Sequence, residues 1–385
     1  MAEVFLAFFR LGCLSFGGPV THLGMFRAEF VQRRRWLSEE AFGQCIALTQ
    51  LLPGPASSQT GMLIGYLRAG PLGSLTAWIA FTLPSAVLMT IFALNAVIWN
   101  SQLGWVRGVL AVAAAIVAQA VLSMRRSLAR TPLQLAMLFA TFAAVLVSPL
   151  PQTGPIAIGV CALTGMLFAH GSVSIEHPLD MRISRRAGVV AAIAFALTLG
   201  ALAIAARTGN LALRLAWSMF RTGILVFGGG HVVLPMLQTQ AVREGIATPH
   251  QLIGGYAAAQ LMPGPLFTIS SYVGAASFNG ALGILGAFIA TLAIFAPSFF
   301  LLAAVAPFYA QLCRNERFAA ALAAANASVV GLLAAAFVTP VWMNAIHGWR
   351  EGVIAAAAFA AMTVWKRPAW NAVLAGALAG AAFLR

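Results

Sequence analysis

Long apolar runs separated by short polar loops occupy almost the whole chain. The runs lie at about 4–25, 41–66, 72–99, 104–124, 133–149, 154–170, 187–206, 211–239, 251–277, 280–311, 318–346, 352–365 and 369–384. A helix needs roughly 20 apolar residues to cross a bilayer. The pattern therefore predicts an all-α polytopic membrane protein.

One polar stretch, residues 171–186, is longer than the other loops. It divides the chain into a first repeat (1–170), a linker with a connecting transmembrane helix (171–210) and a second repeat (211–385).

The two parts share a glycine motif. Phe9–Gly12 followed by Phe16–Pro19 recurs as Phe220–Gly223 followed by Phe227–Gly230, at an offset of 211 residues. Two rare motifs in the same order and spacing indicate an internal duplication.

A second set of motifs follows the first in both parts. Gln50–Pro55 recurs as Gln260–Pro265, and Leu83–Ser85 is echoed by Ala296–Ser298. Glycine and proline are costly inside a helix, so the glycine clusters and the Pro-Gly-Pro motifs predict broken helices. Simple kinks for helix packing are the alternative.

The basic residues predict the orientation of the elements. Suppose that the four elements broken by glycine or proline enter the membrane and return to the side from which they came. The arginine clusters at 33–35, 125–126 and 185–186 then lie on one side, which is the cytoplasmic side because positive charge gathers there. Five crossings would separate the repeats, so the second would be inverted. A parallel duplication, with 4–25 and 211–239 as full spans, is the alternative.

Composition narrows the function. The chain is 61% hydrophobic and 8% charged, so it has no room for a large aqueous domain such as a fused ATPase. Its net charge of +14 lies mostly in short loops, which indicates membrane orientation rather than nucleic-acid binding. We find no HExxH motif, clustered carboxylate pair or serine nucleophile elbow, and no metal-ligand spacing. We therefore expect no enzyme activity, cofactor or metal.

The broken elements are the candidate binding site. Half-helix N-termini direct N–H groups into a cavity, and glycine lets a ligand approach the backbone. The candidate positions are the two glycine clusters and the two Pro-Gly-Pro motifs: Gly17, Gly18, Pro53, Gly54, Pro55, Gly228, Gly229, Gly230, Pro263, Gly264 and Pro265.

Polar side chains accompany these breaks. Arg10 and Arg221 each precede a glycine cluster by seven residues and lack an acidic partner one turn away, so they could pair with an anion. Snorkelling to the interface is the alternative. His22 and His231 could bind an oxyanion in a pH-dependent way, or they could pack. Gln50 and Gln260 could donate to an anion, or they could bond between helices.

The acidic residues favour an anion over a cation as the ligand. All nine lie in loops, in the linker or at the ends of apolar runs. Carriers of cations usually need a carboxylate inside the membrane. The sequence therefore predicts an anion carrier.

Several motifs together resemble the chromate ion transporter family in its long, two-domain form. They are Phe9–Gly12 with Phe16–Pro19, Arg34–Leu37, Leu52–Pro55, Phe227–His231 with Leu234–Pro235, and Met262–Pro265. The first repeat has Gly-Gly-Pro where the second has Gly-Gly-Gly, so the two turns need not be equivalent.

The resemblance implies a multi-pass carrier of the bacterial inner membrane that exports chromate and gives chromate resistance. Its partners would be chromate or a sulfate-like oxyanion and the lipid bilayer, without nucleic acid. A carrier of sulfate or another oxyanion and an anion channel are the alternatives. The sequence leaves the oligomeric state open, including a homodimer.

Overall fold

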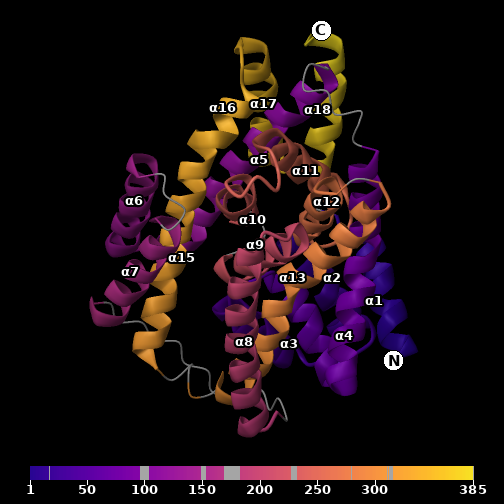
Figure 1. The fold of residues 1–385 in the computed structure, drawn as a ribbon, viewed down its shortest axis with the longest axis vertical. Coiled ribbons are helices and arrows are strands. Elements are labelled where there is room, and N and C mark those ends of the chain that lie inside the picture. The colour runs from indigo at the N-terminus through magenta and orange to yellow at the C-terminus, as the bar shows by residue number, and fades with distance from the viewer. Residues whose placement is uncertain are drawn as a thin grey trace.

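The fold is entirely helical in the part of the chain that the structure describes, which confirms the predicted class (Figure 1). This computed structural model describes residues 1–16, 18–95, 104–148, 153–168, 183–226, 232–278, 280–309, 311 and 315–384. Five of its helical segments are long and apolar enough to cross a membrane: Ala56–Leu94, Gly104–Arg126, Arg185–Thr208, Leu282–Phe308 and Glu316–Ala345.

The elements follow the predicted apolar runs. The first part contains α1 (Ala2–Leu14), α2 (Pro19–Phe26), the π-helix η1 (Arg27–Arg33), α3 (Glu39–Leu51), α4 (Ala56–Leu94), α5 (Gly104–Leu128), α6 (Pro132–Val147) and α7 (Thr153–Phe168). The connecting helix is α8 (Arg185–Ala205), followed by η3 (Ala206–Thr208). The breaks predicted near the glycine and Pro-Gly-Pro motifs separate α1 from α2 and α3 from α4.

The second part repeats this order. It contains α9 (Leu211–Leu225), α10 (Val233–Leu237), η5 (Gln238–Val242), α11 (Pro249–Leu261), η6 (Leu266–Thr268), α12 (Ile269–Ala276), α13 (Leu282–Val305), η7 (Ala306–Phe308), α15 (Glu316–Ala336), η8 (Phe337–Trp342), α16 (Met343–Ala345), α17 (Trp349–Thr363) and α18 (Ala369–Phe383). α4 corresponds to α12 and α13 together, because α4 is itself interrupted by non-helical backbone at Ala69 and Gly70.

The broken elements are hairpins whose two ends meet. In the first repeat, Glu3 near the start of α1 accepts from Arg34 at the end of η1 and from Arg68 in α4, both at 3.1 Å. In the second repeat, Arg214 in α9 pairs with Glu244 after η5, and the Ser277 hydroxyl donates to the Ile246 carbonyl at 3.2 Å. Each hairpin therefore returns to the end from which it started, as the re-entrant arrangement predicts.

The second repeat is inverted relative to the first. Residues 71–94 of α4 correspond to α13, and these two helices run antiparallel. The Trp78 ring, early in this part of α4, lies 5.6 Å from the ring of Phe295, late in α13. Leu94, at the end of α4, lies against Gly283 at the start of α13. Equivalent helices in a parallel duplication would point the same way, so this geometry excludes that alternative.

The repeats also exchange their last two helices. α6 and α7 pack along α15 of the second repeat, and α17 and α18 pack along α5 of the first (Figure 1). Glycine permits close approach here, because a Cβ on Gly104 would lie 2.5 Å from the Gly380 carbonyl oxygen. Buried Glu351, at the start of α17, accepts from Arg107 near the start of α5. This ion pair aligns α17 parallel to α5.

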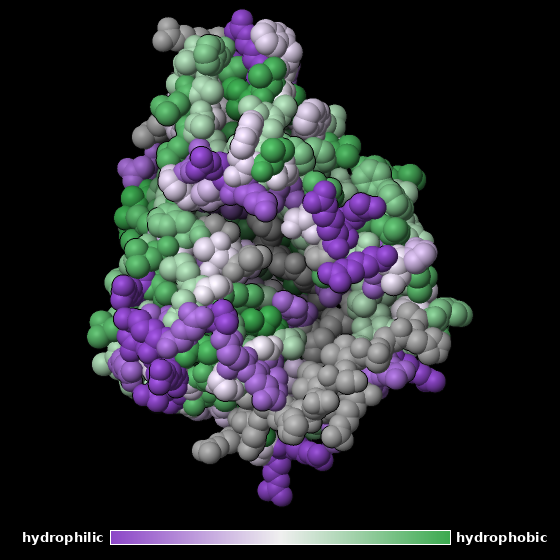
Figure 2. Space-filling view, turned by 180° about the vertical axis from the view of Figure 1, so that it is seen from behind, coloured by the Kyte–Doolittle hydropathy of each residue, from purple (hydrophilic) through white to green (hydrophobic). Residues whose placement is uncertain are grey.

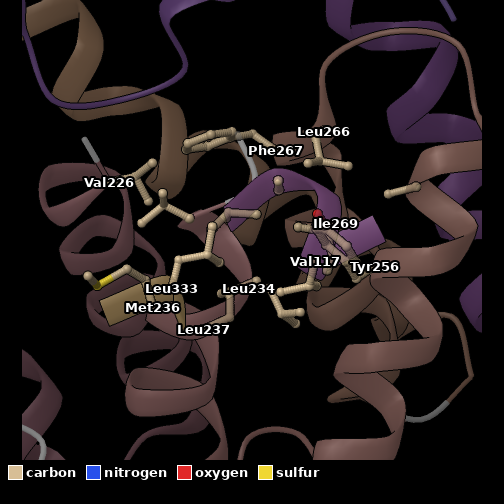
Figure 3. Close-up of a cluster of buried hydrophobic side chains, with 14 of the residues drawn as sticks. Val117, Val226, Leu234, Met236, Leu237, Tyr256, Leu266, Phe267, Ile269 and Leu333 are labelled. Atoms are coloured by element: carbon tan, nitrogen blue, oxygen red, sulfur yellow. The ribbon is translucent and has the colours of Figure 1, made fainter. Parts of the chain in front are cut away.

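The main hydrophobic core joins both repeats. Figure 3 shows side chains from α5, α10, α11 and α15 converging on the segment that follows the second glycine cluster, among them Val117, Leu234, Tyr256 and Leu333. All four are essentially fully buried. The outer surface in Figure 2 is largely hydrophobic, with hydrophilic side chains gathered in separate patches. Such a surface suits a protein surrounded by lipid.

Candidate functional site

The tips of the hairpins from the two repeats are joined by a pair of exchanged hydrogen bonds. The Gly54 N–H donates to the Val226 carbonyl at 2.6 Å, and the Gly264 N–H donates to the Ser15 carbonyl at 2.8 Å. Gly54 and Gly264 are equivalent positions, as are Ser15 and Val226. The fold thus brings both Pro-Gly-Pro motifs against the entrances of both glycine clusters.

Only glycine fits the two Pro-Gly-Pro turns. Gly54 has φ +121° and Gly264 has φ +101°, which side-chain-bearing residues rarely adopt. A Cβ on Gly54 would lie 2.9 Å from the Ser298 Oγ, and one on Gly264 would lie 2.6 Å from the Ser85 Oγ. Each turn therefore presses on the Pro-Ser motif of the opposite repeat.

His22 lies at this junction and is almost fully buried on α2. Its Nε2 lies 3.2 Å from the Ser15 carbonyl oxygen, and its Nδ1 lies 3.3 Å from the Ser57 Oγ. The neutral tautomer with a proton on Nε2 satisfies both contacts, with the Ser57 hydroxyl donating to Nδ1. The Ser15 carbonyl that His22 contacts is the one that accepts from Gly264.

The N-terminus of α4 supplies the strongest anion-directed feature of the site. The first N–H groups of a helix have no intrahelical partner and carry the positive end of the helix dipole. α4 begins at Ala56, directly after the Pro-Gly-Pro turn, and its first turn contains the buried hydroxyls of Ser57 and Ser58. The Ser58 Oγ has no hydrogen-bond partner in the described part of the chain.

Gln59 connects the two repeats in the next position. Its Nε2 donates to the Pro53 carbonyl at 2.7 Å and to the Ser298 Oγ at 3.2 Å. Gln59 is fully buried. This side chain holds the first Pro-Gly-Pro turn against α13.

The two predicted arginines lie away from the buried faces of their helices. Arg10 is exposed on α1, whereas Val4, Phe8 and Leu11 form the buried face. Arg221 is half-buried on α9 and stacks over the Trp217 ring, with its guanidinium carbon 5.2 Å from the ring centroid. Neither forms an ion pair with another described residue.

The remaining predicted site residues fall into those that the structure describes and those that lie outside the described residues. Gly18, with φ +83°, directly precedes α2 as its N-cap. At the hairpin tips, Pro55, Pro263 and Pro265 are buried and Pro53 is half-buried. Gln260 is buried and hydrogen-bonds Tyr256, whereas Gln50 is exposed. Gly17, Gly228, Gly229, Gly230 and His231 lie outside the described residues.

The described acidic residues lie at helix ends, as the sequence predicts. Buried Glu29 accepts from Arg33 and Arg34 at the end of the first hairpin, and Glu39 pairs with Arg27 at the start of α3. No described carboxylate lies at the hairpin tips. The junction is therefore suited to a negative ligand.

Sequence reasoning missed four polar residues of the junction: Ser57, Gln59, Ser85 and Ser298. The repeated Pro-Ser pair was a usable signal, since it recurs in both parts. Its position against the opposite Pro-Gly-Pro turn depends on the antiparallel packing of α4 and α13.

Comparisons with known proteins find relatives that match most of the chain. The chain is 29% identical to a chromate transport protein of Pseudomonas aeruginosa, over 98% of this chain and 91% of the relative. It is 26% identical to a probable chromate transport protein of Synechococcus elongatus, over 86% and 82% of the two chains. A chromate transport protein of Cupriavidus metallidurans is 23% identical over 88% and 82%.

No solved structure matches this chain. The sequence profile described as "Chromate transporter" matches residues 2–166 and 213–381, which correspond to the two inverted repeats. The motifs, the duplicated helical fold and this match together show that the chain belongs to the chromate transporter family.

Proposed function

We propose that this protein is a secondary carrier that exports chromate across the bacterial inner membrane and thereby gives chromate resistance. The observation that carries the proposal is the pair of exchanged hydrogen bonds, Gly54 to Val226 and Gly264 to Ser15. They bring the breaks of both repeats to one place, where discontinuous helices of inverted-repeat transporters bind substrate.

The N-terminus of α4 is the proposed anion-binding element. Its free N–H groups and the hydroxyls of Ser57 and Ser58 are donors, and a tetrahedral dianion needs several donors at once. Protonation of His22 at Nδ1 would reverse its bond with Ser57, because Nδ1 would then donate. The Ser57 hydroxyl could then donate to the anion, which would couple proton uptake to binding.

Alternating access requires the tips to separate. The Gly54 and Gly264 N–H groups are engaged across the junction, so rocking of one repeat against the other would break these bonds in turn. Export needs no ATP, since a membrane potential that is negative inside expels a dianion with about 4.6 kcal/mol per 100 mV.

Chromate flux into inverted membrane vesicles tests the proposal. We expect saturable uptake that sulfate inhibits, that depends on the membrane potential, and that a proton gradient alters. Absence of chromate uptake would overturn the proposal. Uptake of sulfate but not chromate would identify a sulfate carrier instead, and unitary currents in planar bilayers would identify an anion channel.

The orientation is tested by tags placed after Arg130 and after Arg243. Arg130 follows α5, and Arg243 follows the first hairpin of the inverted repeat. We expect the first tag to be cytoplasmic and the second external, because this arrangement puts the arginine-rich hairpin ends inside. Accessibility of both tags from the same side would contradict it.

A further inference from the structure

A polar cavity lies between the C-terminal ends of α5 and α17, separate from the hairpin tips. It has a volume of about 480 Å³ and is lined by Gln119, Leu122, Ser123, Arg126, Arg130, Met362, Thr363 and Lys366. Three of these residues are cations: Arg126 lies near the end of α5, and Arg130 and Lys366 lie just after the ends of α5 and α17. No acidic residue is among the described residues that line it.

The three cations have no ion-pair partner in the described residues. Arg126, Arg130 and Lys366 are exposed, and none of them forms an ion pair with a described carboxylate; the buried carboxylate of α17, Glu351, pairs with Arg107 instead. Membrane orientation requires positive charge at this end of the helices, but it does not require the charges to line a cavity. Three unpaired cations around one hollow attract a ligand with more than one negative oxygen.

The surroundings place the cavity at the edge of the membrane. α5 and α17 run parallel, since Arg107 and Glu351 pair at their starts and the cavity lies between their ends. Next to Lys366 in sequence, Val364 and Trp365 are 70% and 67% exposed. An exposed tryptophan beside a lysine is typical of the interface between lipid tails and headgroups.

From this geometry we infer that the cavity binds a phosphate-type anion. Arg126, Arg130 and Lys366 neutralise its charge, and Gln119, Ser123 and Thr363 add polar side chains to the lining of the same hollow. Two sources present this chemistry at this level: the headgroup of an anionic phospholipid and a soluble oxyanion such as inorganic phosphate. Basic cavities between membrane helices at the cytoplasmic side commonly bind anionic lipid headgroups.

The test compares a cavity variant with a matched variant of equal charge change. The cavity variant carries Arg126→Gln, Arg130→Gln and Lys366→Gln. The control carries Arg185→Gln, Arg186→Gln and Arg317→Gln, which are exposed residues at the starts of α8 and α15, outside the cavity. Each protein is reconstituted in nanodiscs of phosphatidylcholine, with or without phosphatidylglycerol, and with or without excess inorganic phosphate.

The first readout is the shift in Tm that each anion produces, and the second is phosphatidylglycerol retained in native mass spectrometry. We expect phosphatidylglycerol to raise the Tm of the wild type and the control, and to raise that of the cavity variant by less than half as much. Retained lipid should fall in parallel. A Tm shift from inorganic phosphate in pure phosphatidylcholine, lost only in the cavity variant, would identify a soluble anion as the source.

Equal Tm shifts and equal lipid retention in the cavity variant and the control would overturn the inference. If the triple variant does not fold, the single substitution Ser123→Leu provides the same test, because it narrows the cavity without removing charge. Unchanged responses to both anions in this variant would also overturn the inference.

Discussion

The hairpin tips of the two repeats share a backbone geometry but differ in their side chains. The first repeat places Ser15, His22, Ser57 and Gln59 at the junction. The equivalent positions of the second repeat hold Val226, Val233, Phe267 and Ile269, all of which are buried.

The helix starts at the two tips differ in the same way. After the first Pro-Gly-Pro turn a long α-helix carries Ser57 and Ser58 in its first turn, whereas after the second a 3-10 turn, Leu266–Thr268, begins with buried apolar residues. The comparison teaches that both repeats supply the crossed backbone contacts, while Ser15, His22 and Ser57 have apolar equivalents in the second repeat. Under the proposed function, the anion binds to the first repeat and the second repeat provides the surface against which that site closes.

The largest effect is expected where the shared backbone geometry is broken. Gly54→Ala and Gly264→Ala each place a Cβ at a positive φ and against a serine of the other repeat. Such strain costs about 1–3 kcal/mol, and we expect a large fall in Tm with loss of chromate flux in both variants. Gly43→Ala in α3 is the control, since a Cβ there meets nothing within 4 Å. Normal flux in either tip variant would contradict the shared geometry.

The next largest effect on chromate flux is expected when polar side chains of the first tip are replaced by their apolar equivalents from the second. His22→Val with Gln59→Ile gives the first repeat the residues that the second already accepts. We expect chromate flux to fall by roughly tenfold to a hundredfold, because the loss of His22 and Gln59 leaves buried hydrogen-bond partners unsatisfied, which costs about 1–3 kcal/mol.

Ile269→Val is the matched change in the second repeat, and it should alter Tm but leave flux nearly unchanged. Chromate flux measured in inverted vesicles at equal protein content shows whether transport depends more on the first tip than on the second. Equal loss of flux from both changes would mean that the two tips contribute alike.

For the two predicted arginines, the comparison favours the residue of the second repeat as the more important one for transport. Arg221 is half-buried and stacked on Trp217, while Arg10 is exposed. We expect Arg221→Gln to reduce chromate flux more strongly than Arg10→Gln. Trp217→Leu, which leaves the guanidinium in place, serves as the control for the lost stacking. Normal flux in both arginine variants would remove the arginines from the mechanism.

The smallest effect, a change in Tm, is expected for substitutions of the acidic residues at the hairpin ends. The hydrogen bond from Arg68 holds the pKa of Glu3 below its ordinary value. A carboxylate with a lowered folded pKa stabilises the fold above its unfolded pKa, and this contribution disappears as the pH falls through the folded pKa.

We therefore expect Glu3→Gln to lower Tm slightly at neutral pH and to weaken the loss of Tm on acidification. Glu244→Gln should have a still smaller effect, since Glu244 lies 3.9 Å from the Arg214 Nε. A larger change in Tm for Glu244→Gln than for Glu3→Gln would show that the ion pair at the hairpin end of the second repeat contributes more to stability than the one in the first.

Much of the fold was predictable because membrane helices leave strong local signals. Apolar runs, glycine clusters and proline motifs predicted the main helical segments and the two sets of broken hairpins, but not the interruption at Thr339 in η8. The charge bias also predicted inversion, since arginine placement follows membrane side. The arginine-rich ends of the first repeat, near Glu3 and Arg34, meet as that layout requires.

The chemistry of the site was less predictable, because it depends on which faces of the helices become buried. Arg10 and Arg221 attracted notice as lone charges in apolar runs, but their neighbours are set by the packing of α1 on α4 and of α9 on α13. Gln59 and Ser298 are 239 residues apart and show no shared pattern, yet they hydrogen-bond across the junction.

The sequence by itself determined that this is a duplicated membrane protein with broken helices and no acidic residue inside its apolar runs, and its charge bias favoured inversion of the second repeat. Those properties follow from local composition and periodicity. Only the tertiary structure decided that α4 and α13 run antiparallel and that Gly54 and Gly264 donate across the junction. It also decided that Gln59 of the first repeat meets Ser298 of the second, and that α5 and α17 enclose a basic cavity. These features arise from contacts between helices that are distant in sequence, and such contacts have no local signature.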